Sequence, residues 1–166
     1  MTVRAATACL VLAATAAIPA RAENVAAERL QSMGDVMPAA PRDFVRQPRL
    51  GTWSSPSAST ATATYEAEDG RAFSVVVTFS AENARQNRDL LKDKTQRDMF
   101  GMEARKIGGR DGLARKPSNT NASVAVFVVV LSDSRVVSVT DSFGTTDPAL
   151  LRSVLEATDF DAIARR

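Results

Sequence analysis

Histidine is absent from this 166-residue sequence, and cysteine occurs only once, at Cys9. Without histidine the chain cannot form a Ser-His-Asp triad, and with a single cysteine it cannot form an internal disulfide. Zinc, copper and haem sites generally need imidazole or thiolate ligands, so the composition argues against them too. The chemistry that remains is that of carboxylates, lysine or tyrosine bases, and oxygen ligands for Ca²⁺ or Mg²⁺. We therefore expect no catalytic site and no cofactor.

Aromatic side chains are also scarce, at 5% of the sequence, and Trp53 is the only tryptophan. Proteins that hold sugars by stacking use the flat faces of several aromatic rings. The low aromatic content argues against recognition of that kind.

Residues 1–22 have the pattern of a secretory signal peptide. Arg4 supplies a positive charge, residues 5–18 form an uncharged apolar run, and residues 19–22 end in an Ala-x-Ala cleavage site. The apolar run is too short to span a membrane. The sequence therefore predicts export to the periplasm or beyond, cleavage between Ala22 and Glu23, and removal of Cys9 with the leader.

Without the leader, the sequence has no surplus of basic or of acidic residues. The whole sequence has 21 basic and 19 acidic residues, and the leader holds Arg4, Arg21 and no acid, so 19 of each remain. Nucleic-acid binding needs an excess of positive charge facing the phosphates. The composition therefore excludes nucleic acid as a partner.

Residues 23–60 are expected to form a short helix followed by a Pro/Ser-rich linker. Ala26, Leu30, Met33 and Met37 recur at helical spacing, which places them on one face. Pro38 ends this helix, and the frequent proline, alanine and serine that follow favour an extended, solvated chain. We expect the helix to pack on the domain as an accessory element; the alternative is a helix that docks into a groove of a partner.

Phe44 and Trp53 are the large aromatic side chains of this linker. Trp53 could cap the end of the core or anchor a partner, and capping is the simpler interpretation. If this region binds a partner, the candidate contact residues are Phe44, Trp53, Leu30 and Met33.

A folded domain is expected over residues 61–166. Apolar and polar residues alternate over 61–68, a second strand over 73–79 has phenylalanine or valine at every position of one face, and Asp69-Gly70 between them is typical of a hairpin turn. Ser80 can cap a helix that runs to about Arg97. Charges of both signs alternate along this helix, which favours a solvated face of i,i+4 pairs over a basic binding site.

The sequence of the second half of the domain predicts more strands and a closing helix. Gly108-Gly109 joins two strands over 102–116; we expect a turn or bulge here, because no Lys-Ser/Thr follows as in a phosphate-binding loop. Residues 124–131 are apolar on both faces, which indicates a central strand, and 135–140 return beside it. Thr146 or Asp147 caps the last helix, with Pro148 in its first turn.

Together these elements predict a single α+β domain. Short connections between successive strands imply an antiparallel sheet, and the lack of a βαβ alternation excludes a doubly wound fold. We expect five to six strands and two packed helices in the order ββα-ββββ-α, plus the N-terminal helix and Pro-rich segment. One helix covers each face, or both cover one face and the N-terminal region covers the other.

The acids outside the leader offer two weaker alternatives. Asp141 and Asp147 lie in an oxygen-rich loop and are the best metal candidates, but their spacing is not that of an EF-hand, so we expect no metal. A hydrolase with paired carboxylates would have to draw on Glu66, Glu68, Asp141 and Asp147.

This order of elements resembles the small α+β domains of the Mog1/PsbP/DcrB-like group. The resemblance rests on the hairpins at residues 65–79 and 124–139 and on the closing helix at 150–160, about two-thirds of the mature chain. It implies a non-enzymatic accessory or binding role.

These observations predict an exported, non-catalytic periplasmic accessory protein that binds another protein or an envelope component. The alternative is a small-ligand-binding protein with an apolar pocket between the sheet and a helix or the N-terminal segment. A carboxylate hydrolase is the third hypothesis.

Overall fold

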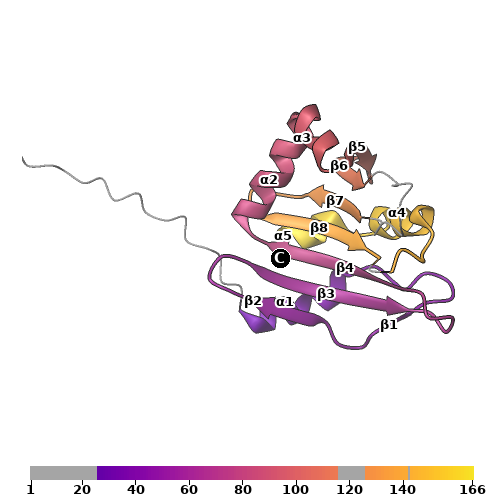
Figure 1. Cartoon of the computed structure of the whole chain (residues 1–166). Helices are drawn as coiled ribbons and strands as arrows, with labels where there is room; N and C mark the ends of the chain where they lie inside the picture. Colours follow the sequence, from indigo (N-terminus) through magenta and orange to yellow (C-terminus); the bar gives the residue numbers. More distant parts are fainter. Residues whose placement is uncertain (1–25, 116–125, 142) are drawn as a thin grey trace, which may run out of the picture.

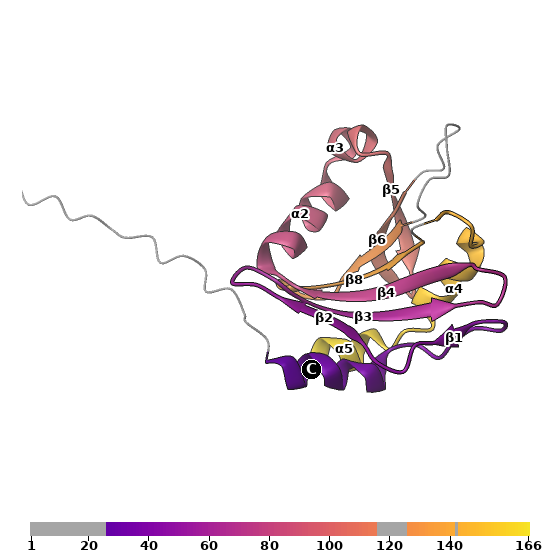
Figure 2. The ribbon, with the colours of Figure 1, turned by 60° about the horizontal axis from the view of Figure 1, so that its bottom comes forward.

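The computed structural model describes residues 26–115, 126–141 and 143–166. Within these residues, eight strands form one sheet, and helices lie on both of its faces (Figures 1 and 2). The chain is therefore α+β with an antiparallel sheet, as its short connections predict. The predicted leader, residues 1–22, lies outside the described residues.

The sheet is antiparallel at every pairing, in the order β1-β3-β4-β8-β7-β6-β5, and β2 pairs with β3 beside β1. The strands are β1 (Val45–Arg46), β2 (Gly51–Ser54), β3 (Ser59–Glu66), β4 (Ala72–Phe79), β5 (Met102–Ile107), β6 (Arg110–Arg115), β7 (Val126–Val130) and β8 (Arg135–Thr140). Pairing of β4 with β8 joins the two predicted hairpins, although more than 50 residues separate these strands in the chain.

Five α-helices and one 3-10 helix accompany the sheet in the described part of the chain. They are α1 (Ala27–Ser32), the 3-10 helix η1 (Met33–Val36), α2 (Ala81–Lys92), α3 (Lys94–Met99), α4 (Pro148–Glu156) and α5 (Phe160–Arg165). In Figure 2, α2 and α3 lie above the sheet and α1 and α5 lie below it.

From β3 onward, the predicted order ββα-ββββ-α is confirmed, with both helical regions divided in two. The predicted count of five to six strands is wrong, because β1 and β2 were not expected. These two strands are short and lie at the edge of the sheet, and most of their side chains are exposed. A strand that buries neither face carries no alternation of apolar and polar residues, so the pattern cannot reveal it.

The helix predicted from Ser80 to about Arg97 begins as expected and breaks at Asp93. The Ser80 hydroxyl accepts a hydrogen bond from the backbone N–H of Asn83 at 3.3 Å, which caps α2. Asp93 has extended backbone angles, and its carboxylate accepts from the N–H of Gln96, so it ends α2 and caps α3. The single predicted helix is therefore two.

The predicted hairpin turns are confirmed. Gly70 has a φ of +87°, and Gly108 and Gly109 have φ of +55° and +78°. Two consecutive positive φ angles between paired strands define a type I′ turn, which right-handed twisted strands favour. The loop at Gly108-Gly109 is therefore a turn, as the sequence predicts.

The segment predicted as a solvated linker forms part of the fold. Its two strands pair with β3, and Met37 and Phe44 are buried in the main core. Arg46 Nη1 donates to the Gly34 carbonyl at 3.0 Å, which ties β1 to η1. The expectation that the folded domain begins near Ala61 is therefore wrong.

The main core lies on one face of the sheet, which we call the buried face. It combines alternate residues of β3, β4 and β8 with apolar side chains from the N-terminal region, α4 and α5. Its largest fully buried side chains include Tyr65, Phe73, Phe79, Leu30 and Met33. On the other face, α2 packs on β6, β7 and β8 over a smaller cluster.

Candidate functional site

Three of the four predicted partner contacts are core residues. The exposed fractions of Leu30, Met33 and Phe44 are 1%, 0% and 6%. Phe44 meets Phe73 edge-on, with ring centroids 5.1 Å apart, and the guanidinium of Arg71 lies over its ring. Their prediction as contact residues is corrected: the helical stripe of the N-terminal region packs on its own domain and is not available to a partner.

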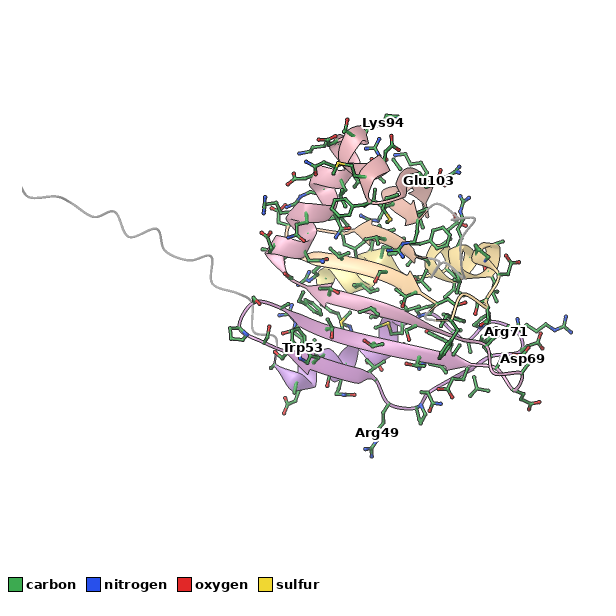
Figure 3. The ribbon with its side chains drawn as sticks, viewed as in Figure 1. Arg49, Trp53, Asp69, Arg71, Lys94 and Glu103 are labelled. Carbon is green, nitrogen blue, oxygen red and sulfur yellow. The ribbon has the colours of Figure 1, made fainter. Side chains whose placement is uncertain are left out.

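Trp53, the fourth predicted contact residue, lies at the surface. Its exposed fraction is 55%, so the expectation that it caps the core is wrong. It lies on β2, directly opposite Thr60 of β3, and Figure 3 shows it at the end of the molecule away from Lys94 of α3. A large exposed aromatic ring on a regular strand is a candidate contact residue.

The carboxylates of Asp141 and Asp147 accept hydrogen bonds from backbone N–H groups. Asp141 is fully buried, and its carboxylate accepts from the N–H groups of Phe143 and Gly144, both at 2.9 Å, and of Thr146. Asp147 accepts from the N–H of Ala149 at 2.8 Å and so caps α4, as predicted. Since N–H groups repel cations, this loop is suited to hold a carboxylate and not a metal ion. No group of three or more potential ligands occurs in residues 26–115, 126–141 and 143–166.

The other acids named for a hydrolase lie at the surface. Glu66 is exposed at the end of β3, where its Oε2 accepts from Gln47 Nε2 at 2.7 Å. Glu68 lies near the surface in the turn that follows. With Asp141 held by three backbone groups and Asp147 serving as a cap, these four acids do not form the facing pair that glycoside hydrolysis needs.

Trp53 and a set of small, uncharged side chains lie together on the face of the sheet opposite the main core. We call this set the hydroxyl face; its members are Trp53, Thr60, Thr62, Thr64, Ser74, Val76, Thr78, Ser138 and Thr140. The strand register places all of them on one side, for example Trp53 opposite Thr60, and Thr60 opposite Thr78. Directly opposite side chains lie about 5 Å apart and alternate residues on a strand about 7 Å apart, so the hydroxyl groups form a two-dimensional array.

Helix α2 packs on β6, β7 and β8, whereas most of the hydroxyl face lies beside it on β2, β3 and β4. Val136 of β8 is buried in the cluster that contains Ala84 of α2. Its direct partner on the next strand, Thr78, is partly exposed. Figure 1 shows most of β3 and β4 facing the viewer with no helix in front of them. All members of the hydroxyl face on β3, β4 and β8 are accordingly partly exposed to solvent.

The hydroxyl face also has free hydrogen-bonding capacity. Thr64 Oγ1 and Ser74 Oγ lie 3.4 Å apart and can bond to each other. Five further hydroxyls make no side-chain hydrogen bond within the described residues, namely those of Thr60, Thr62, Thr78, Ser138 and Thr140. Each hydroxyl offers one donor and two acceptor positions to water or to a ligand.

No family model, curated protein or solved structure matches this chain. The likeness to the Mog1/PsbP/DcrB-like group therefore stays a prediction, and function has to be inferred from the geometry of the chain itself. In the part of the chain that the structure describes, no helix is long and apolar enough to cross a membrane.

A groove lies between α2 and α3. This groove of about 780 Å³ is lined mostly by charged and amide side chains, with Leu90 and Phe100 as its apolar members. Among its charged residues, Arg85 forms ion pairs with Glu82 at 2.7 Å and Asp89 at 3.5 Å, and the Asp93 carboxylate accepts from the N–H of Gln96. It is not the apolar pocket between sheet and helix that the small-ligand hypothesis expects, and that hypothesis stays a prediction.

The sequence carries a signal for the hydroxyl face, although on its own this signal indicates only the strands. Threonine alternates with alanine through Thr60, Thr62 and Thr64, and residues 138–140 of β8 alternate hydroxyl residues with valine, whereas in β4 three consecutive valines separate Ser74 from Thr78. What the pattern lacks is the order of the strands, which sets these rows beside one another.

Proposed function

We propose that the protein is an exported, non-catalytic accessory protein that binds a component of the cell envelope through its hydroxyl face. Export is supported by the signal-peptide pattern of residues 1–22. A non-catalytic role is supported by the absence of histidine and by the position of the single cysteine inside that leader.

The uncovered hydroxyl face is the observation that carries the binding part of this proposal. An antiparallel sheet commonly packs one face on the core and leaves the other in contact with water, so the exposed Trp53 is what distinguishes this open face from an ordinary one. Here the face on β3 and β4 consists of short side chains that tolerate water, and Trp53 stands exposed beside them at 55% of its surface. This combination suits a surface that is wet in the free protein and covered in a complex.

Site-specific photo-crosslinking in the periplasm tests this proposal. A benzophenone amino acid placed at Thr62, in the middle of β3, is expected to form a defined adduct in living cells. Thr52 provides a matched control, because it is exposed on the neighbouring strand and its register partner, Ala61, belongs to the buried face. The adduct is then identified by mass spectrometry.

The proposal requires that the adduct from position 62 be absent at position 52 and be lost when Trp53→Ala is added. Equal adducts from both positions, or none from position 62, would show that the hydroxyl face is not the contact surface. Fractionation of the same cells checks export, since the mature chain must be found in the periplasm.

A further inference from the structure

We infer that the hydroxyl face binds a neutral polysaccharide chain, with the indole ring of Trp53 stacked on one sugar ring. This inference rests on the proposed function and names the class of its ligand. Three properties of the face lead to it: the lack of charge, the residue types, and the free hydroxyl groups beside an exposed aromatic ring.

The lack of charge excludes anionic ligands. None of the nine members of the hydroxyl face is ionisable. The charged residue that continues the row of Thr62 and Thr64 is Glu66, at the end of β3, and it is an acid that already bonds Gln47. Phosphates, anionic lipid headgroups and acidic polysaccharides require cationic side chains, which this surface does not offer.

The residue types argue against a protein as the occupant. Binding energy at protein interfaces concentrates in tryptophan, tyrosine and arginine, whereas serine, threonine and valine are under-represented among such residues. Apart from Trp53, the hydroxyl face consists entirely of serine, threonine and one valine, Val76. It lacks the cluster of large side chains that would anchor a protein partner.

A neutral sugar chain matches what the face does offer. Sugar hydroxyls both donate and accept, so they can pair with the unbonded hydroxyls of Thr60, Thr62 and Thr78. The C–H groups on the flat side of a pyranose ring complement the negative face of the indole ring. β3 is about 27 Å long at about 3.4 Å per residue, which accommodates several consecutive sugar rings.

The low aromatic content argued against a sugar site built from several stacked rings. On this surface one ring suffices for one sugar unit, because the remaining contacts come from the hydroxyl array. The exposure of Trp53 and its register with Thr60 become known only from the fold.

Binding of neutral hexasaccharides to the purified mature protein tests the inference. The panel is cellohexaose, chitohexaose, maltohexaose and laminarihexaose, with hexagalacturonate as the anionic comparison. Because Trp53 is the only tryptophan, its fluorescence reports on the site directly, and calorimetry gives the affinity of variants without it. We expect saturable binding of at least one neutral hexasaccharide with a shift in the emission of Trp53, and binding of hexagalacturonate about tenfold weaker or absent.

Three variants locate the binding. Trp53→Ala is expected to weaken it about tenfold, Trp53→Phe less, and Thr62→Glu to abolish it by placing a charge in the array. Thr52→Glu adds the same charge on β2 on the opposite side of the sheet and is expected to bind as the original protein does. Circular dichroism and thermal unfolding establish that every variant is folded.

The inference is overturned if no neutral hexasaccharide binds, or if Trp53→Ala and Thr62→Glu both bind with unchanged affinity. Should that occur while crosslinking from position 62 still captures an envelope protein, the hydroxyl face stands as the contact surface and only its ligand class is wrong. Failure of both experiments removes the proposed function as well.

Discussion

The hydroxyl of Tyr65, near the end of β3, donates a hydrogen bond to the carbonyl oxygen of Pro38, 2.7 Å away. Both residues are buried, and the ring of Tyr65 stacks on Phe73 with centroids 4.7 Å apart. This bond holds the chain that leaves η1 against the buried face of the sheet. It explains why a proline-rich segment is part of the core and not a linker.

Replacing Tyr65 by phenylalanine removes the hydroxyl and with it this bond. We expect Tyr65→Phe to lower the free energy of unfolding by about 1–2 kcal/mol, because the buried Pro38 carbonyl loses its partner. Urea unfolding followed by circular dichroism measures the change. Thr52→Val is the control, since it removes a hydroxyl that is exposed, and we expect a change within about 0.5 kcal/mol. Equal effects of the two substitutions would contradict the role given to the bond.

The same tyrosine makes the stability depend on alkaline pH. Burial raises the pKa of Tyr65 above its ordinary value of 10.0, and the nearby Arg46 opposes this effect in part. Above pH of about 10 the unfolded chain releases the phenol proton while the folded chain retains it, so stability falls as the pH rises further. Below that pH the contribution is fully present.

Titration checks this expectation directly, because Tyr65 is the only tyrosine in the sequence. The absorbance of the tyrosinate should appear at higher pH in the folded protein than in urea. Relative to Tyr65→Phe, the original protein should lose stability between the pH at which tyrosinate forms in urea and the higher pH at which it forms in the folded protein. Coincident titrations in the folded and unfolded protein would refute the predicted shift.

The two glycines of the β5–β6 turn are expected to differ in their tolerance of a side chain. A Cβ at Gly108 would lie 2.9 Å from Cε2 of the buried Phe160, whereas one at Gly109 would have nothing within 4 Å. Both have positive φ, so alanine strains either position by about 1 kcal/mol. We expect a loss of about 1 kcal/mol for Gly109→Ala and about 2–3 kcal/mol for Gly108→Ala.

Thermal unfolding of the two variants side by side measures this difference. Gly109→Asn serves as a further control, since asparagine tolerates positive φ better than alanine does. Equal stability of Gly108→Ala and Gly109→Ala would show that a Cβ at position 108 does not clash with Phe160 at a measurable cost in stability.

Asp141 is expected to stabilise its loop without a metal ion. Asp141→Ala leaves backbone N–H groups of Phe143, Gly144 and Thr146 without their acceptor, so we expect a loss of about 2–4 kcal/mol. Asp133→Ala removes an exposed carboxylate paired with Arg88 and should cost less than about 1 kcal/mol. Addition of Ca²⁺ should leave the melting temperature of the original protein unchanged. A rise in that temperature with Ca²⁺ would contradict the assignment.

Local interactions made much of this fold predictable. The Ser80 cap, the Asp147 cap and the turn at Gly70 depend on contacts between residues two or three positions apart, which the sequence displays directly. The alternation in β3 and β4 reflects a sheet with one side deeply buried. The break at Asp93 escaped prediction because the charged pattern continues through it.

Local patterns therefore specify the identity and order of the main strands and helices from residue 59 onward, since their signals lie within short stretches of chain. The burial of Phe44 and the exposure of Trp53 followed only from how the whole chain packs. Both belong to segments beside the edge of the sheet, where burial depends on which element packs across the strand. The N-terminal region packs over the buried face of the sheet. On the other face, α2 packs on β6, β7 and β8 and does not extend over Trp53. Two members of the hydroxyl face, Ser138 and Thr140, join it only because β8 pairs with β4, a strand distant in sequence, which no local pattern specifies.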